Sequence, residues 1–138
     1  MNVLIVDDDV LLARALARAL GKVGHTCQIA SSVDSAVALV ATERPSLVLT
    51  DLDLGGAGDG VDLAAWLRHA GVRVPIVMMT GSDVELARIE LARAGLDEVD
   101  VLAKPFPLRR LLTVLAEHGA AQAAGPGGPP RADKDAWS

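Results

Sequence analysis

The sequence predicts an α/β fold in which five parallel strands form one doubly wound sheet with helices on both faces. Five short apolar runs, rich in leucine and β-branched residues and without a helical period, are typical of strands buried on both sides. Longer segments with helical patterning alternate with them, which favours strand–helix units. The strands are expected at residues 2–6, 26–30, 47–50, 76–79 and 99–103.

The first predicted helix spans about residues 10–23 and follows the first strand directly. Leu12, Leu16 and Leu20 recur at every fourth position, so they should form its buried face. Gly24 lies just past the end of the pattern, where a glycine commonly terminates a helix.

The other helices are placed by their start and stop signals. Capping boxes at Ser31-x-x-Asp34 and Ser82-x-x-Glu85 begin the second and fourth helices. The third covers about residues 61–70, and the fifth starts near Pro107, a favourable first-turn residue. The second, fourth and fifth helices are expected to end near Glu43, Ala94 and His118.

Acidic residues follow two of the predicted strands. The first strand runs into Asp7-Asp8-Asp9, and the third runs into Asp51. Function collects at the carboxyl ends of parallel strands, so these carboxylates should meet at one edge of the sheet. They would repel one another if unneutralised, and hard oxygen ligands suit Mg²⁺ or Mn²⁺. The pattern therefore predicts a divalent cation among Asp7, Asp8 and Asp51.

Two more strands end on polar residues of a complementary kind. The fourth strand runs into Thr80, and the fifth runs into Lys104-Pro105. A hydroxyl and an ammonium facing a carboxylate cluster would suit an anion with several oxygens, held beside a metal. A phosphoryl group is the obvious candidate for that anion.

The segment from Gly55 to Gly60 is too rich in glycine to be regular structure. It lacks the Gly-Lys-Ser/Thr ending of a phosphate-binding P-loop. We expect these glycines instead to allow a close approach of the backbone to the site above Asp51.

Composition limits the remaining possibilities. The 138 residues suffice for one domain with a real core, and 51% of them are hydrophobic. A net charge of -5 argues against nucleic-acid binding, and the single cysteine, Cys27, fits a reducing compartment. No apolar stretch is long enough for a membrane span, and the chain enters a strand at once, so a cytoplasmic protein is expected. From Gly119 on, an Ala-, Gly- and Pro-rich composition predicts a flexible tail over residues 119–138.

The four strand ends together resemble the receiver domain of bacterial two-component response regulators, which has a flavodoxin-like (βα)5 fold. The resemblance covers about residues 1–118, and it rests on Asp7-Asp8, Asp51, Thr80 and Lys104-Pro105 in the family's order. It implies a signalling domain, not an enzyme, that accepts a phosphoryl group from a sensor histidine kinase or a histidine phosphotransfer protein.

The resemblance also implies a role for each site residue. Asp51 would be the phosphoacceptor. Asp8 would be a direct ligand of Mg²⁺ or Mn²⁺, Asp7 would act through bound water, and Asp53 would offer its backbone carbonyl. Thr80 and Lys104 would each contact a phosphoryl oxygen, and the Lys104-Pro105 bond would be cis.

Receivers of this family generally dock their kinase with the first helix. With Leu12, Leu16 and Leu20 buried, the outward residues beside the acidic site would be Leu11, Arg14, Ala15 and Arg18. Exposed Leu11 and Ala15 would form a small apolar patch suited to a partner helix.

Several details depart from the family pattern, among them segments at residues 51–60 and 95–104 that look slightly longer than usual. Gly55 stands where a proline is common, four residues after the acceptor. Val101 stands where many relatives carry a Tyr, Phe or His ring that moves inward with the threonine. We therefore expect a switch that works through Thr80 and the following helix, without an aromatic ring at Val101.

Other functions stay open at this point. Asp51-Leu52-Asp53 also matches the Asp-x-Asp signature of haloacid-dehalogenase-type phosphatases, which need a further acidic motif after their lysine. An unphosphorylated pseudo-receiver is a second alternative. The chain could be a stand-alone regulator or the receiver part of a larger one, and a monomer or a phosphorylation-dependent dimer. Its output partner is unknown, with neither nucleic acid nor membrane expected.

Overall fold

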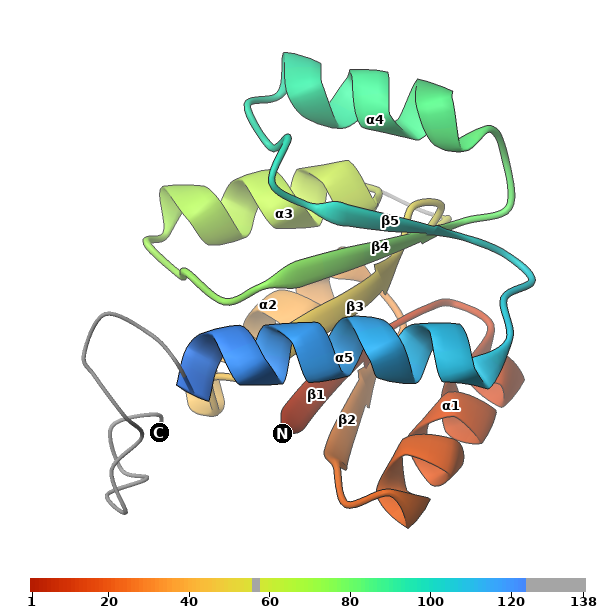
Figure 1. The fold of residues 1–138 in the computed structure, drawn as a ribbon. Helices are drawn as coiled ribbons and strands as arrows, with labels where there is room; N and C mark the ends of the chain where they lie inside the picture. The colour runs from red at the N-terminus through yellow and green to blue at the C-terminus, as the bar shows by residue number, and fades with distance from the viewer. Residues whose placement is uncertain (56–57, 124–138) are drawn as a thin grey trace. The chain divides into compact units, whose positions relative to one another are not determined.

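The computed structural model describes residues 1–55 and 58–123 of the 138-residue chain. The chain divides into two compact units, one over Met1–Pro105 and a second that begins at Phe106. Among the described residues, the first unit holds five strands and four helices, and the second holds helix α5 (Leu108–Ala123) (Figure 1). Every polar residue that the sequence predicts at a strand end lies in the first unit.

The five strands form one parallel sheet. They are β1 (Asn2–Val6), β2 (Thr26–Ala30), β3 (Leu47–Asp51), β4 (Ile76–Thr80) and β5 (Asp100–Ala103). Their order is β2-β1-β3-β4-β5, and all four neighbouring pairs are parallel. The chain moves from β1 to β2 on one side and returns to β3 on the other. The carboxyl ends of β1 and β3 therefore flank the reversal point where open α/β sheets bind ligands.

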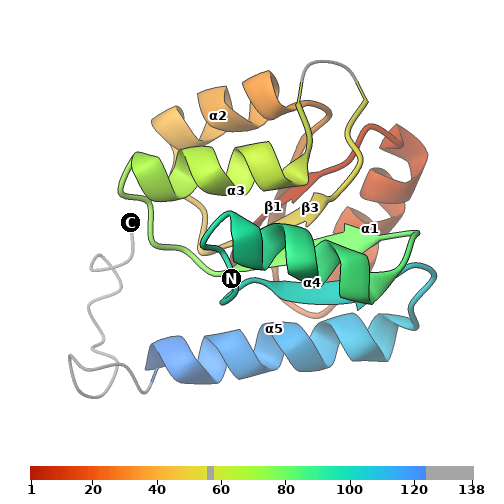
Figure 2. The same cartoon turned by 90° about the horizontal axis from the view of Figure 1, so that it is seen from above.

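Helices of the first unit cover both faces of this sheet, as the sequence predicts. They are α1 (Val10–Lys22), α2 (Val33–Thr42), α3 (Gly60–His69) and α4 (Val84–Arg93). Helices α2 and α3 lie side by side in both views (Figures 1 and 2). The buried side chains that join α2, α3 and α4 to one face of the strands include Leu4, Val48, Met78, Ala36, Leu63 and Leu91.

Helix α1 packs against the opposite face. Successive strand residues point to opposite sides, and the buried Val3 and Ile5 alternate with Leu4 of the first face. Helix α1 contacts β1 and β2. Leu16 and Leu20 are buried as predicted, but Leu12 is only partly buried and Ala13 is buried instead. The face is therefore rotated slightly from the predicted one, because a small alanine lets the helix backbone approach the sheet.

Two of the predicted helix N-caps are wrong by one residue. Helix α2 is capped by Ser32, which forms a capping box with Ser35, rather than by Ser31 with Asp34. Helix α4 is capped by Asp83 rather than Ser82, through a bond from the Glu85 amide. Short polar side chains stand next to each other at both places, and only the backbone geometry decides which of them accepts the amide bond.

Helix α3 begins at a cap that the sequence analysis missed. The Asp59 carboxylate accepts a bond from the Asp62 amide at 3.0 Å, and the Asp62 carboxylate accepts one from the Asp59 amide at 3.0 Å. This reciprocal pair starts the helix at Gly60, one residue before the predicted start.

Helix α5 is longer than predicted. The sequence places its end near His118, but the structure continues it to Ala123. Gly119 does not stop it, since the Ala-Ala-Gln-Ala that follows consists of good helix formers. The rest of the predicted tail, residues 124–138, lies outside the described residues. In the described part of the chain, no helix is long and apolar enough to cross a membrane.

Candidate functional site

Four strand ends bring polar side chains to one edge of the first unit. Asp7 follows β1, Asp51 is the last residue of β3, Thr80 is the last residue of β4, and Lys104 follows β5. The parallel register aligns these ends, because Asp51 pairs with Met79 and Thr80 pairs with Ala103. These residues therefore lie together at one edge of the sheet, as predicted.

Lys104 joins two of the acids. Its Nζ donates to Asp7 Oδ2 and to Asp51 Oδ2, at 3.1 Å in each case. Asp7 is completely buried, and its other oxygen accepts a bond from the Asp9 amide at 2.9 Å. Asp51 keeps 12% of its side chain exposed, and its Oδ1 accepts a bond from the Asp53 amide at 3.3 Å. The acceptor candidate is thus fixed by the protein but still open to a reactant.

The resemblance implied a role for Lys104 at a phosphoryl oxygen, and its bond to Asp7 was not predicted. That bond places the ammonium between the ends of β1 and β3. The signal that could have revealed it is the register of the sheet, since β1 and β3 are neighbours and Asp7 follows β1 directly.

The charges at this edge are only partly balanced. Burial raises the pKa of Asp51, and the hydrogen bond and charge of Lys104 oppose that rise without cancelling it. Burial would lower the pKa of Lys104, but its hydrogen bonds to Asp51 and Asp7 outweigh burial and raise the pKa. Lys104 is therefore held in its charged form. The charged form of Asp51, in contrast, is not fully stabilised by Lys104 against the cost of burial. A further cation would supply the missing stabilisation.

The acids around Asp51 fit such a cation. Asp7, Asp8 and Asp51 each offer an oxygen, and these oxygens lie within 4.8 Å of one another. Asp8 is exposed, whereas Asp7 has both oxygens engaged by protein donors. A set of hard carboxylate oxygens that includes the exposed Asp8 suits Mg²⁺ or Mn²⁺, which keep several waters when bound. Asp53 is exposed beside them.

Thr80 lies across the site with its hydroxyl already engaged. The side chain is completely buried, and Oγ1 accepts a bond from the Ser82 amide at 3.0 Å. The Thr80 carbonyl in turn accepts a bond from the Lys104 amide at 2.7 Å. The backbone of β4 is thereby tied to the segment that carries the lysine, and the Lys104-Pro105 peptide bond there is cis, as the resemblance implied.

Two glycines of the segment after β3 allow the main chain to approach the site closely, as predicted. A Cβ at Gly60 would overlap the carbonyl oxygen of Asp51, and one at Gly55 would lie 3.0 Å from Asp8 Oδ2. Gly55 has φ +56°, a left-handed value that the proline common at this position in the family could not adopt. Residues 56 and 57 of the loop lie outside the described residues.

The remaining predicted positions differ in exposure. Val101 is buried on β5 opposite Met78, so its side chain belongs to the core and not to the surface. On α1, the four predicted docking residues Leu11, Arg14, Ala15 and Arg18 are all exposed. Leu11 has 78% of its surface exposed, a large value for a leucine.

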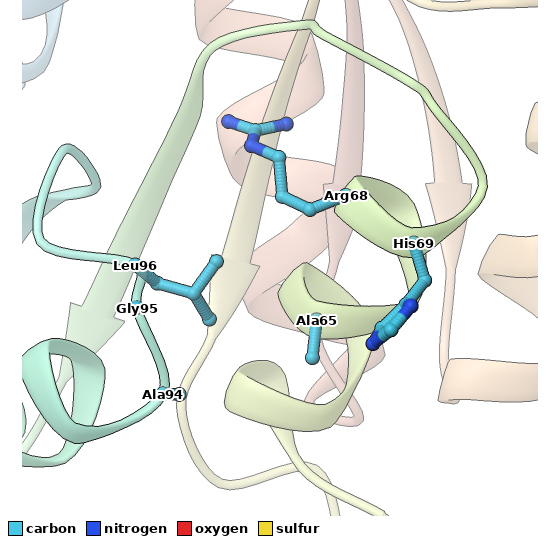
Figure 3. A pocket seen from close by; sticks show the side chains of 6 residues that line it. All are labelled: Ala65, Arg68, His69, Ala94, Gly95 and Leu96. Atoms are coloured by element: carbon cyan, nitrogen blue, oxygen red, sulfur yellow. The ribbon is translucent and has the colours of Figure 1, made fainter.

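A cavity of about 230 Å³ lies elsewhere in the first unit, between the end of α3 and the segment after α4 (Figure 3). It is lined by Ala65, Arg68, His69, Ala94, Gly95 and Leu96, none of which was predicted as a site residue. The Arg68 guanidinium is held by Glu98 at 3.1 Å and by the Val72 carbonyl at 2.8 Å. These contacts link α3 to the start of β5 and give Arg68 a structural role.

Known sequences resemble the chain over most of its length. Residues 3–116 match the response regulator receiver domain family. Response regulator MprA of Mycolicibacterium vanbaalenii is 34% identical over 112 residues, which are 81% of this chain and 47% of that protein. Response regulator protein FleR of Pseudomonas aeruginosa is 34% identical over 124 residues, 90% of this chain and 26% of that protein. The chain thus spans about half the length of MprA and about a quarter of FleR.

Solved structures resemble it in the same way. The receiver domain of NtrX from Brucella abortus superimposes with a TM-score of 0.76 at 31% identity, covering 84% of this chain and 96% of that one. The BeF3-activated N-terminal receiver domain of RstA from Klebsiella pneumoniae gives 0.76 at 31% identity, covering 86% and 97%.

Sheet order, strand-end acids and these matches define a phosphoaccepting signalling domain of the two-component type. The chain belongs to the response regulator receiver domain family. Neither alternative, the haloacid-dehalogenase-type phosphatase or the pseudo-receiver, is favoured by these findings.

Proposed function

We propose that Asp51 is the residue that receives the phosphoryl group, from a phosphohistidine of a sensor kinase or of a histidine phosphotransfer protein. One observation carries the assignment. Lys104 Nζ lies 3.1 Å from Asp51 Oδ2 at the carboxyl end of β3, and the Asp51 side chain is still 12% exposed. A nucleophile here is held by a cation on one side and remains reachable on another.

The transfer needs no covalent bond to any protein residue other than Asp51. A carboxylate oxygen of Asp51 bonds to phosphorus as the bond from phosphorus to the histidine nitrogen breaks, and the imidazole leaves. Phosphoryl transfer depends mainly on positioning and on neutralising the phosphoryl oxygens. Lys104 is oriented for that role by its second bond to Asp7, which keeps the ammonium beside the acceptor.

We further propose that Mg²⁺ or Mn²⁺ is the cofactor of this site. Asp8 and Asp51 would bind it directly, Asp7 would act through water, and Asp53 would contribute its carbonyl oxygen. When bound, the cation would offset the charge of the acids and of the incoming phosphoryl group. The raised pKa of Asp51 supports this proposal, because Lys104 alone leaves the buried carboxylate short of positive charge.

The exposed part of α1 is proposed as the kinase-docking surface. Leu11, Arg14, Ala15 and Arg18 are exposed there, and α1 begins right after the acidic triplet. An exposed leucine with a neighbouring alanine suits an apolar stripe on a partner helix, while the arginines can pair with acids at its rim.

Phosphorylation would act on Thr80. The Thr80 hydroxyl accepts a bond from the Ser82 amide and keeps its own hydrogen to donate. A phosphoryl oxygen on Asp51 would accept that hydrogen and draw Oγ1 toward the acceptor, which would lengthen the bond from the Ser82 amide. Asp83, the cap of α4, follows Ser82 directly, so the change would reach α4 without an aromatic ring at Val101. We place this switch within a cytoplasmic receiver domain of about residues 1–118, with which the family match over residues 3–116 agrees.

The acceptor assignment is tested by intact mass measurement after incubation with acetyl phosphate and Mg²⁺. The wild type should gain one phosphate, and Asp51→Asn should gain none. Asp53→Asn is the matched control and should still be labelled. Equal labelling of wild type and Asp51→Asn would refute the site, no labelling of the wild type would favour a pseudo-receiver, and turnover of added phosphoesters would favour the phosphatase.

A further inference from the structure

We propose that Gly60 is a positioning residue for the phosphoacceptor: the lack of a side chain at this place lets the first residue of α3 rest on the Asp51 peptide and hold it in register. This inference rests on the proposed role of Asp51 and extends it to a residue that touches neither phosphoryl group nor metal.

The contact of Gly60 with β3 is a backbone contact. An added Cβ would overlap the Asp51 carbonyl oxygen and would lie 3.1 Å from the Leu52 α-carbon and 3.0 Å from Met78 Sδ. The methionine sulfur is the end of a flexible chain and could move. The Asp51 and Leu52 atoms belong to the main chain, so a side chain at residue 60 could be admitted only if the peptide that carries the acceptor and the start of α3 moved apart.

Hydrogen bonds fix this peptide from several directions. The Gly60 amide donates to the Leu52 carbonyl at 2.8 Å, and the Leu52 amide donates to the Met79 carbonyl at 2.8 Å. The buried Thr50 hydroxyl donates to the Asp51 carbonyl at 3.0 Å. Gly60, the first residue of α3, contacts this part of the main chain from the helix side. The position of Asp51 therefore depends on how closely α3 approaches the end of β3.

The same contact closes the loop that carries Asp53. The hydrogen bond from the Gly60 amide to the Leu52 carbonyl joins the two ends of this loop. Asp53 follows Leu52 directly and is therefore the first residue of the loop. The reciprocal cap of Asp59 and Asp62 fixes the helix start at the other side of Gly60. Gly60 thus both closes the loop and begins helix α3, and it must lack a side chain for both contacts to form.

Conformational freedom is not the reason for a glycine here. Gly60 is not among the described residues with positive φ, and it lies in a helix, where alanine is ordinarily the better residue. Gly21 in helix α1 is a matched comparison, since a Cβ there would meet nothing within 4 Å. Alanine should therefore be harmless or stabilising at Gly21 and disruptive at Gly60.

The experiment compares Gly60→Ala with Gly21→Ala and the wild type, all as the full chain. For each protein, Mg²⁺ affinity is measured from amide chemical shifts, and the rate of acetyl phosphate labelling is measured by intact mass at saturating Mg²⁺, well below the melting temperature. Displacing a reacting group by a fraction of an ångström to an ångström costs about tenfold or more in rate. We expect Gly60→Ala to label about tenfold more slowly and to bind Mg²⁺ more weakly, while Gly21→Ala matches the wild type.

Failure of this inference and failure of the proposed function give different results. A folded Gly60→Ala protein that matches Gly21→Ala in both rate and affinity would overturn the positioning role, even if its melting temperature is lower. A wild type that takes no phosphate would instead overturn the role of Asp51. If Gly60→Ala does not fold, the wild type decides by NMR. A slowly exchanging Gly60 amide that shifts with the Mg²⁺ titration supports the role, and a rapidly exchanging amide unaffected by Mg²⁺ overturns it.

Discussion

Lys104 Nζ donates at 3.1 Å to Asp7, the one acid of the cluster with Asp8 and Asp51 that is completely buried. A buried carboxylate needs a cationic or hydrogen-bonded partner, and the Asp9 amide supplies the only other bond that we see to it among the described residues. Lys104 therefore stabilises the fold as well as serving the proposed transfer.

Removing Lys104 should consequently cost stability. In Lys104→Met, Asp7 and Asp51 keep their charges and lose their shared cation, and we expect the free energy of unfolding in EDTA to fall by roughly 1–3 kcal/mol. The value is kept modest because the Lys104 side chain is 22% exposed. Urea unfolding measures it. Lys22→Met, at an exposed lysine of α1, is the control and should change stability much less, and an equal loss in both variants would contradict this account.

The metal proposal predicts different effects of two neighbouring acids. Asp8→Asn removes a proposed direct ligand, so its Mg²⁺ affinity, followed by amide shifts, should fall at least about tenfold. Asp53→Asn keeps the proposed ligand, which is a backbone carbonyl, and should weaken binding only slightly through the lost charge. Equal affinity of wild type and Asp8→Asn would show that Asp8 is not a ligand.

The raised pKa of Asp51 makes stability depend on pH. Because the pKa is higher in the folded protein than in the unfolded chain, the folded state holds the proton more tightly. The resulting stabilisation is present below the unfolded pKa and is lost as pH rises through the folded pKa. Asp51→Asn, which cannot ionise, should thus gain stability over the wild type in EDTA at pH 7, and the gain should shrink toward about pH 4.

Urea unfolding of the two proteins at several pH values provides the test. A constant difference between wild type and Asp51→Asn across the range would mean that the carboxylate is not strained by burial. Added Mg²⁺ should reverse the order at pH 7, since only the wild type has the acceptor carboxylate to bind it.

The switch proposal concerns the Ser82 amide. When the phosphoryl mimic beryllofluoride is bound with Mg²⁺, the Thr80 hydroxyl should donate to it, and the resulting movement of Oγ1 should weaken the bond that it accepts from the Ser82 amide. Hydrogen exchange should then become faster at Ser82 and change along residues 80–85, in α4 and in residues 95–100. Thr80→Ser keeps the hydroxyl and should respond, whereas Thr80→Ala should not. Changes confined to residues 51–60 would show that the signal does not leave the site through Thr80.

The docking proposal separates two kinds of phosphoryl donor. Leu11→Glu together with Ala15→Glu should slow transfer from the cognate kinase, once it has been found by phosphotransfer profiling, by about tenfold or more. Labelling by acetyl phosphate, which needs no docking, should be unchanged. Leu86→Glu on α4 is the matched control, since Leu86 is also highly exposed, at 60%, but lies on another helix. Unchanged kinase transfer in the α1 variant would contradict the proposed surface.

The boundaries show where sequence patterns are weak. Strands were predicted to within one residue at each end, since a buried strand is bounded by turn residues and polar groups on both sides. The N-caps at Ser32 and Asp83 were missed by one residue, because neighbouring Ser and Asp side chains are equally able to cap. The end of α5 at Ala123 was missed because a single glycine predicts a stop that good helix formers around it override.

The sequence by itself determined the fold and which polar residues meet at one edge of the sheet. Short apolar runs that are rich in β-branched residues and lack a helical period indicate buried strands. A chain that alternates them with helices brings their carboxyl ends, and with them Asp7, Asp51, Thr80 and Lys104, to one edge. The tertiary structure decided the contacts within that edge: that Lys104 bridges Asp7 and Asp51, that the Thr80 hydroxyl is engaged by Ser82, and that Gly60 rests on the Asp51 peptide. Periodicity indicates the type and the approximate bounds of each element. Contacts of a few ångströms depend on how side chains from several elements share one space, and no single segment of the sequence encodes that.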